Sequence, residues 1–281
     1  MSSEAGRLFT RVTAVYFSPS GSTETVTKRI AAKIAELAGV PCEVDDFTLP
    51  DARVKERRFG AEDLVVFGMP TYAGRLPNLI APAVRELFHA DGALAVPVVL
   101  YGNRSIDDSL MELRNTLTEN GFVPAAAAAF VGAHTFSKVL AAGRPDASDL
   151  DAADQFAGAV LDKLTRTGRN GLGMVQVPGR DPVGPYYTPR GLDGQPAKFL
   201  KAKPKTSEAC DRCGICQKVC PMGSIDPEDP ASIPGICIKC GACIRKCPKS
   251  AKFFDDPAYL SHLGMLEKNF LDRHPDPAFF L

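Results

Sequence analysis

The chain has 281 residues, 45% hydrophobic and 23% charged, a composition typical of a globular protein with room for two domains. Lys and Arg together number 33, as do Asp and Glu, so no charge excess favours nucleic acid or an anionic membrane as a partner. The N-terminal sequence MSSEAGRLFTRV lacks a long apolar core, and no apolar run approaches the roughly 20 residues that cross a bilayer. We therefore expect a cytoplasmic protein without a signal peptide or a membrane span.

Residues 8–170 alternate short apolar runs with longer helical patterns. Strands are expected at 11–17, 42–46, 63–68, 96–101 and 121–131, and helices near 23, after 77, near 107 and near 148. The last helix opens with Ser148 and Asp151 at the spacing of a capping box. Alternating strands and helices predict a parallel sheet covered on both faces. We therefore assign residues 1–170 to one doubly wound α/β domain with five strands.

A region of different character begins near residue 171. Residues 171–204 are rich in Gly and Pro without sustained periodicity, which predicts a connector. Its residues Tyr186, Tyr187 and Phe199 need apolar surroundings, so we expect the connector to pack against both domains. Residues 205–254 hold most of the cysteines and should form a small domain. Residues 255–281 offer a helix and an apolar end that should dock.

Eight of the nine cysteines form two copies of C-x-x-C-x-x-C-x-x-x-C-P, and the copies lie 27 residues apart. In a reducing compartment, clustered cysteines indicate metal rather than disulfides. This spacing is that of two [4Fe–4S] clusters, in which the last Cys of each copy serves the other cluster. We assign one cluster to Cys210, Cys213, Cys216 and Cys247, and the other to Cys237, Cys240, Cys243 and Cys220.

The alternative to clusters is one zinc ion held by two C-x-x-C pairs. That site would use Cys213, Cys216, Cys237 and Cys240, and it leaves the other four cysteines and the repeat unexplained. Cys42 stands alone and is expected to be a small buried hydrophobic residue.

A loop of sequence SPSGSTE follows the first strand and leads into a helix. Hydroxyls and free N–H groups at a helix N-terminus form an anion site. Because the loop lacks Gly-Lys-Ser/Thr, it does not resemble the triphosphate loop of an NTPase, and it suits a monophosphate such as that of FMN. A plain helix cap is the alternative.

The third and fourth strands end in GMPTYAGRLP and YGNR. Ligands of such sheets bind at the carboxyl ends of the strands, where these loops offer aromatic rings, glycines and cations. Tyr72 and Tyr101 are candidates for stacking on the flavin, Gly74 for a peptide that reorients near it, and Arg75 or Arg104 for a counter-charge. Ordinary loop anchors and solvated arginines are the alternative. The candidate FMN contacts are Ser18, Ser20, Gly21, Ser22, Thr23, Thr71, Tyr72, Ala73, Gly74, Arg75, Tyr101, Gly102, Asn103 and Arg104.

Taken together with HTFS at 134–137 and GRPD at 143–146, these motifs resemble the fused flavodoxin–ferredoxin proteins of anaerobes. The resemblance implies a flavodoxin-like sheet in the order 2-1-3-4-5, followed by a small α+β bacterial 2[4Fe–4S] ferredoxin domain. It also implies FMN, two [4Fe–4S] clusters and electron transfer between them. The chain departs from commonly described flavodoxins in having no Trp and no acidic excess.

Two functions are open at this point. The first is an electron-transfer protein that couples one- and two-electron steps, with redox proteins or a small-molecule acceptor as partners. The second is an FMN-dependent reductase fed by its own ferredoxin domain, for which His134 is the catalytic candidate. Whether the chain is an enzyme, and whether it forms oligomers, stays open.

Overall fold

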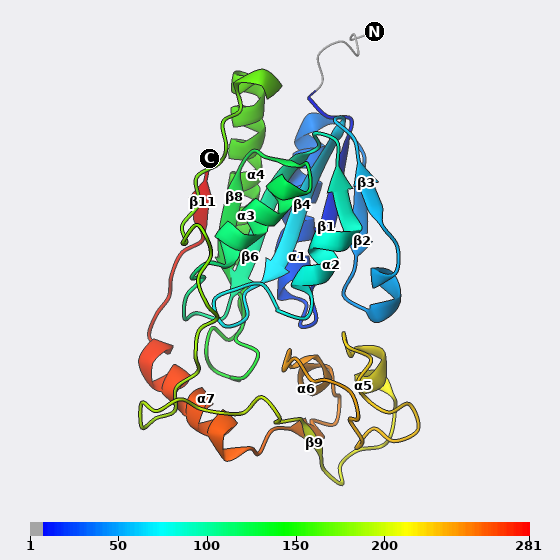
Figure 1. Ribbon diagram of the computed structural model, residues 1–281, viewed down its shortest axis with the longest axis vertical. Helices are drawn as coiled ribbons and strands as arrows, with labels where there is room; N and C mark the ends of the chain where they lie inside the picture. The colour runs from blue at the N-terminus through cyan, green and yellow to red at the C-terminus, as the bar shows by residue number, and fades with distance from the viewer. Residues whose placement is uncertain (1–7) are drawn as a thin grey trace.

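A mainly parallel sheet forms one part of the computed structural model, which describes residues 8–281 (Figure 1). Counted along the chain, its five parallel strands lie in the order 2-1-3-4-5, with helices on both faces. The first seven residues of the expected domain lie outside the described part. The parallel strands are β1 (Arg11–Tyr16), β2 (Cys42–Asp46), β4 (Asp63–Pro70), β6 (Leu94–Tyr101) and β8 (Ala127–Val131). The α/β class predicted from the sequence is confirmed.

The sheet has two further strands, so the prediction of five was too low. β7 (Val123–Pro124) pairs with β6, and β11 (Ala278–Phe280) pairs antiparallel with β8. The ring of Phe279 stacks on that of Phe156, with their centroids 4.9 Å apart. β11 could not be foreseen because it is recruited from the far end of the chain to an edge whose N–H and C=O groups were open. A separate parallel pair is formed by β3 (Arg57–Phe59) and β5 (Phe88–Ala90).

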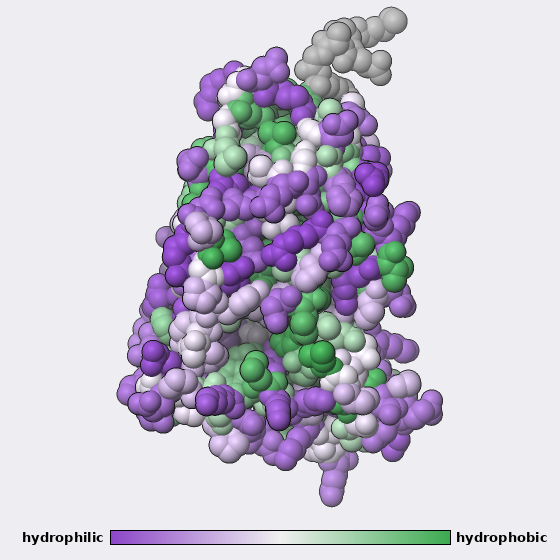
Figure 2. Space-filling view, in the orientation of Figure 1, coloured by the Kyte–Doolittle hydropathy of each residue, from purple (hydrophilic) through white to green (hydrophobic). Residues whose placement is uncertain are grey.

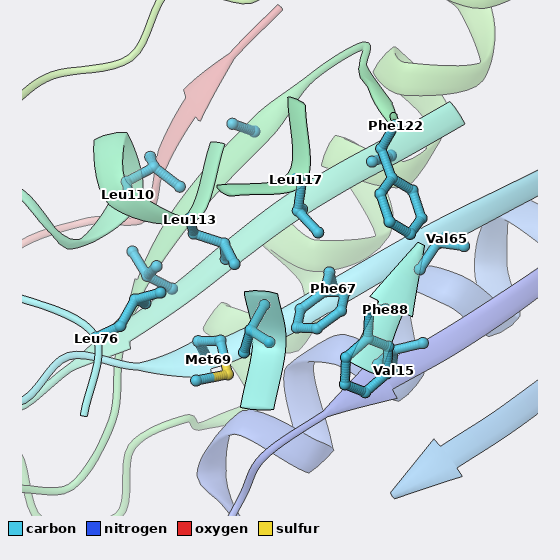
Figure 3. Packing of buried hydrophobic residues seen from close by; sticks show 14 of the residues in the cluster. Val15, Val65, Phe67, Met69, Leu76, Phe88, Leu110, Leu113, Leu117 and Phe122 are labelled. Carbon is cyan, nitrogen blue, oxygen red and sulfur yellow. The ribbon is translucent and has the colours of Figure 1, made fainter. Parts of the chain in front are cut away.

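Helices cover the sheet on both faces (Figure 1). α1 (Ser22–Ala38) and α4 (Ala147–Thr167) pack on the face that receives Leu64 and Val66 of β4. α2 (Ala81–Leu87) and α3 (Ser109–Glu119) pack on the other face, which receives Val65 and Phe67. Figure 3 shows this second core, with Val65 and Phe67 beside side chains of α3. Burial on both faces explains why the strands are continuous apolar runs.

Two expectations at single residues were wrong. The capping box of α4 is formed by Asp146 and Asp149, two residues earlier than expected, and each side chain accepts the other's backbone N–H. Cys42 is exposed rather than buried. It lies in β2, an edge strand that pairs only with β1, so its side chain is not covered by a second neighbour.

The connector follows η2 (Arg169–Gly171) and is held against the sheet domain by hydrogen bonds. Tyr186 Oη donates to the carbonyl O of Leu76 at 2.9 Å, and the Tyr187 N–H donates to that of Ala73 at 2.8 Å. Farther along, Phe199 packs against Tyr259 of α7 (Pro257–Phe270), with ring centroids 5.6 Å apart. Among residues 8–281, no helix is long and apolar enough to cross a membrane.

The cysteine-rich segment forms a small module at the carboxyl ends of the parallel strands (Figure 1). It consists of β9 (Lys205–Thr206), α5 (Ile215–Lys218), α6 (Ala242–Arg245) and β10 (Lys252–Phe253), with β9 and β10 antiparallel. The sequence repeat is also a backbone repeat. Positive φ angles occur in pairs 27 residues apart, at Arg212 and Lys239, Gly214 and Gly241, and Gly223 and Ser250.

Candidate cofactor sites

A cavity of about 560 Å³ lies where the sheet domain meets the module, and we call it the central cavity. The loops after β1, β4, β6 and β8 form one wall, because the carboxyl ends of parallel strands share one edge of the sheet. The connector, α7 and residues 236–239 of the module form the other wall. Leu79, Leu200 and Ile236, which line the cavity, are 40%, 92% and 63% exposed. In Figure 2, apolar residues gather on the surface where the module meets the sheet domain.

One end of the central cavity is the N-terminus of α1. Ser22 and Thr23 are the first residues of this 17-residue helix, so their N–H groups have no intrahelical acceptor. The N-cap is Gly21, which has φ of 96° and supplies no capping side chain. Ser20, Ser22 and Thr23 all line the cavity. Unused donors at a helix N-terminus fit a phosphate group.

The loop after β4 is a tight turn whose two ends bond to each other. The Tyr72 N–H donates to Arg75 O at 2.8 Å, and the Arg75 N–H donates to Tyr72 O at 3.1 Å. Ala73 and Gly74 both have positive φ, as a type I′ turn requires. Tyr72 is half-buried, and burial, followed by the nearby Cys240 and Cys237, raises its pKa well above the ordinary value. Tyr72 therefore lies beside both the cavity and the module.

The loop after β6 brings a cation and a glycine to the cavity. The Arg104 guanidinium lies 4.1 Å from the centre of the Tyr187 ring and also binds Asp107. A Cβ added at Gly102 would lie 2.4 Å from Cδ2 of His134, so only glycine lets these two loops approach so closely.

Most of the predicted flavin contacts meet in this cavity. Those that line it are Ser20, Ser22, Thr23, Thr71, Tyr72, Ala73, Gly74, Tyr101, Gly102 and Arg104. The remaining four, Ser18, Gly21, Arg75 and Asn103, do not line it.

Those four residues act in the surrounding structure. Ser18 Oγ accepts the Glu24 N–H at 2.9 Å, and Gly21 forms the cap described above. Arg75 turns to Glu112, with Nε 2.7 Å from Oε2, so its charge is neutralised away from the cavity. Asn103 Nδ2 donates to the carbonyl oxygens of Phe270 and Arg273, which ties the end of α7 to the sheet domain.

Sequence reasoning missed the opposite wall of the central cavity. The residues there include Tyr187, Phe199, His262 and Leu266. The need of Tyr187 and Phe199 for apolar surroundings was visible in the sequence, but not the place where they pack. His262 and Leu266 carry no local signal, because only the return of α7 brings them to this wall.

Hydrogen bonds fix the tautomers of two histidines in this cavity, and the two rings carry their protons on different nitrogens. His134 Nδ1 accepts the Phe136 N–H at 3.1 Å, so in the neutral ring the proton is on Nε2. His262 Nδ1 lies 2.8 Å from the carbonyl O of Arg190, to which it must donate, so its Nε2 is an acceptor. Burial, with smaller effects of His262, Arg245 and Arg104, lowers the pKa of His134 to about 3. Both rings are therefore neutral near pH 7, since burial also lowers the pKa of His262.

The eight cysteines of the repeat separate into the two groups expected from the sequence. Cys220, Cys237, Cys240 and Cys243 line one small cavity, which we call proximal because it adjoins the central cavity. Cys210, Cys213, Cys216 and Cys247 line another, which we call distal. Among residues 8–281, no three His, Cys, Asp or Glu side chains are grouped so as to hold a metal ion. Each group of cysteines surrounds a space instead.

The surroundings of these cysteines fit an iron–sulfur cluster. Backbone N–H groups point at sulfur in matching positions of the repeat: Ser224 N to Cys220 Sγ at 3.4 Å, and Ala251 N to Cys247 Sγ at 3.3 Å. Burial raises the pKa of the Cys243 thiol to about 12 and that of Cys240 further. Thiols so buried need a metal to become thiolates, and N–H donors stabilise the sulfur charge that results.

The proximal and central cavities share a wall. Cys237, Ile238 and Lys239 line both of them. The module is fixed there by Arg245, whose Nη2 donates to the carbonyl oxygens of His134 at 2.6 Å and Ala133 at 3.2 Å. On the other side of the module, Arg53 of η1 (Pro50–Arg53) donates to the carbonyl O of Pro221.

Comparison with known proteins gave one matching family and several similar structures. Residues 209–252 match the model of a 4Fe–4S dicluster domain. No curated protein matches the sequence. A flavodoxin from the domain Archaea is 14% identical, covers 55% of this chain and 98% of its own, and has a TM-score of 0.36.

Two other similar structures have comparable scores. A flavodoxin of Streptococcus pneumonia TIGR4 is 19% identical over 54% of this chain and 99% of its own, with a TM-score of 0.38. Rubredoxin oxygen:oxidoreductase from Desulfovibrio gigas is 17% identical over 56% of this chain and 38% of its own, with a TM-score of 0.40. At such low similarity, the fold is defined by the order of the five parallel strands, which is that of flavodoxin-like sheets.

Proposed function

We propose that this chain, a flavodoxin-like α/β domain joined to a 4Fe–4S dicluster domain, is an electron-transfer protein. It holds FMN in the central cavity and one [4Fe–4S] cluster in each of the proximal and distal cavities. When bound, the flavin exchanges two electrons with one partner, and the clusters carry single electrons. The chain thereby couples one- and two-electron steps.

The observation that carries this proposal is the wall shared by the proximal and central cavities. Cys237, a proposed cluster ligand, lines the central cavity together with Tyr72 and the flavin loops. A cluster on Cys237 and a ring beside Tyr72 are therefore neighbours without any domain movement. The contacts of Arg245 and Arg53 hold the two domains in this arrangement.

The exposure of the cysteines supports an order for the three centres. Each group has one buried cysteine, Cys216 or Cys240, but only the distal group has an exposed one, Cys213. A redox partner therefore reaches the distal cluster most directly, and the proximal cluster connects it to the flavin. The direction of flow depends on the partner.

This function is tested by photoreducing the anaerobic protein and following the flavin and cluster absorbance on the millisecond scale. In the wild type, cluster reduction should be followed by flavin reduction within one molecule, at a rate independent of protein concentration. Cys237→Ala should retain FMN but lose this fast phase. A fast phase that persists in Cys237→Ala, or a wild type that binds no FMN, would contradict the proposal.

The second candidate, an FMN-dependent reductase, is favoured by the two histidines. His134 of the loop after β8 offers a hydrogen-bond donor and His262 of α7 an acceptor, and both rings line the cavity. A neutral imidazole N–H polarises a carbonyl without releasing a full proton. The ligand would be a small planar molecule with a carbonyl acceptor and a nearby donor.

The reductase candidate is tested with a panel of quinones and α,β-unsaturated ketones under anaerobic turnover. His134→Asn should lower kcat for a true substrate at unchanged FMN content, while the cluster-to-flavin phase stays at the wild-type rate. Equal turnover in wild type and variant would rule out this role of His134.

A further inference from the structure

Lys252 is a buried lysine without a carboxylate partner. It lies in β10 with 3% of its surface exposed, and it is the only lysine among residues 8–281 that is buried. Its Nζ donates to the carbonyl O of Pro230. The nearby ion pairs, Lys205 with Asp255 and Lys249 with Asp211, use other lysines. One carbonyl is poor compensation for a buried ammonium group, which carries three donors.

The position of Lys252 indicates where its counter-charge belongs. The residue lines the distal cavity together with Cys210, Cys213, Cys216 and Cys247. Pro230, whose carbonyl O accepts the hydrogen bond from Lys252 Nζ, lines the same cavity. The ammonium group therefore borders the cavity of the distal cysteines.

The internal repeat has an apolar residue at the position equivalent to Lys252. The residue 27 positions earlier is Ile225, which is 7% exposed and lines the proximal cavity. Equivalent positions of the repeat thus hold an apolar side chain beside one group of cysteines and a cation beside the other. The symmetry of the module is broken at this buried position by one charge.

We propose that Lys252 is a fixed counter-charge that raises the reduction potential of the distal cluster. The inference rests on the proposed cluster ligation. A [4Fe–4S] cluster with four thiolates carries −2 when oxidised, and one electron from a redox partner takes it to −3 with no bond made or broken. A nearby ammonium stabilises the −3 form more than the −2 form, because Coulomb energy scales with charge. Lys252 thus favours the arrival of electrons at the exposed distal cluster.

The test is an anaerobic redox titration of the full chain, with electron paramagnetic resonance to follow each cluster. In Lys252→Met, the reduced-to-oxidised ratio of one cluster at a fixed potential should fall roughly tenfold or more. For a one-electron couple this is a shift of about 59 mV to lower potential. The other cluster should move in the same direction by less, and Lys252→Arg should stay near the wild type.

Two matched controls separate charge from packing. Ile225→Met makes a similar change at the equivalent position without altering charge, and it should leave both potentials in place. Lys249→Met removes an exposed cation that is already paired with Asp211, and its shift should be smaller than that of Lys252→Met because solvent screens the charge.

The remaining outcomes show whether a failure lies in this inference or in the proposed function on which it rests. A wild type without eight iron atoms and two cluster signals would refute the cluster assignment itself. A wild type with both clusters, and potentials unchanged in Lys252→Met, would overturn only the role of Lys252. Lys252→Met and Lys252→Gln could both fail to take up clusters. Cluster uptake by Lys252→Arg would then support the role of the positive charge, whereas failure of all three variants would show that Lys252 is structural.

Discussion

At the scale of single residues, the wall of the central cavity depends on glycines that let neighbouring side chains come close and on a histidine that stays neutral. Gly102 admits the His134 ring, and Gly74 admits Asp107, whose Oδ2 would lie 2.2 Å from an added Cβ. His134 stays neutral because the loops around it exclude water and because cations stand nearby. The two glycines and the neutral His134 therefore allow the loops around the central cavity to pack closely.

Substitution of Gly102 should therefore impair flavin binding. In Gly102→Ala, the new methyl group meets His134, so the loops after β6 and β8 must move apart. We expect FMN affinity, measured by the quenching of flavin fluorescence, to fall at least tenfold. Gly158→Ala is the control: the added methyl has open space in the interior of α4, so stability should rise by about 0.5–1 kcal/mol. Equal affinities of wild type and Gly102→Ala would show that this contact is not needed for binding.

His134 should make the protein less stable at mildly acidic pH. The unfolded chain protonates this residue below about pH 6.5, whereas the folded chain does so only near pH 3. Its contribution to stability is therefore complete above about pH 6.5 and is lost as the pH falls towards 3. Between about pH 7.5 and 5.5, we expect a loss of the order of 1 kcal/mol. Thermal unfolding followed by circular dichroism should show a smaller pH effect in His134→Asn, and an identical effect would contradict this account.

At the scale of elements, each motif acts through the end of a helix or strand. The Ser-rich loop leads into the N-terminus of α1, and the aromatic loops extend the carboxyl ends of β4 and β6. The C-terminal segment has a different role. α7 covers the central cavity, and β11 then closes the sheet edge beside β8. One continuous segment thus fastens the module side of the protein to the sheet.

Loss of the β11 contact should destabilise the whole protein. The Phe279 ring stacks on Phe156 and lies 5.8 Å from the centre of Phe130, so Phe279→Ala removes aromatic packing at the sheet edge. Since Phe279 is 37% exposed, we expect a loss of about 1–2 kcal/mol rather than the full value for a buried Phe. Urea unfolding measures this change. Leu281→Ala, at a position 55% exposed, should lie within about 0.5 kcal/mol of the wild type. A similar loss in both variants would argue against the stacking contact.

At the scale of the whole molecule, the feature that matters is the fixed junction between the domains. Met222 and Ile238 of the module pack against the core of the sheet domain, and Arg53 and Arg245 cross between the two parts. A flexible tether would let the distance between cluster and flavin vary. The packed junction keeps the proximal and central cavities in contact.

Weakening this junction should slow electron exchange without removing either cofactor. Arg245→Ala deletes the hydrogen bonds to the carbonyl oxygens of Ala133 and His134. The rate of flavin reduction after photoreduction of the clusters should fall several-fold, at unchanged iron and FMN content. Lys218 occupies the equivalent position in the first copy of the repeat, 27 residues earlier, and it is exposed. Lys218→Ala should keep the wild-type rate, and a matching decrease there would point to a general loss of charge instead.

The sequence by itself determined the α/β class and the position of the cysteine-rich domain after it, and it predicted the chemistry of the motifs. Strand periodicity, the Ser-rich turn and the cysteine spacing are local patterns, and local patterns are readable because their physical causes lie within a few residues. Two of the errors were also local, whereas the missed strand β11 was not. The α4 cap was placed at Ser148 instead of Asp146, since both offer a side chain suited to capping, and Cys42 was assigned to the interior although its strand lies at an edge.

Only the tertiary structure decided how these parts meet. It brought His262 and Tyr187 to the wall opposite the flavin loops, turned Arg75 to Glu112, and set Lys252 beside the distal cysteines. It also added β11 to the sheet from the far end of the chain. These arrangements depend on contacts between residues far apart in sequence, which are fixed by the packing of whole helices and strands. Such contacts produce no periodic pattern in the sequence of the segments that make them.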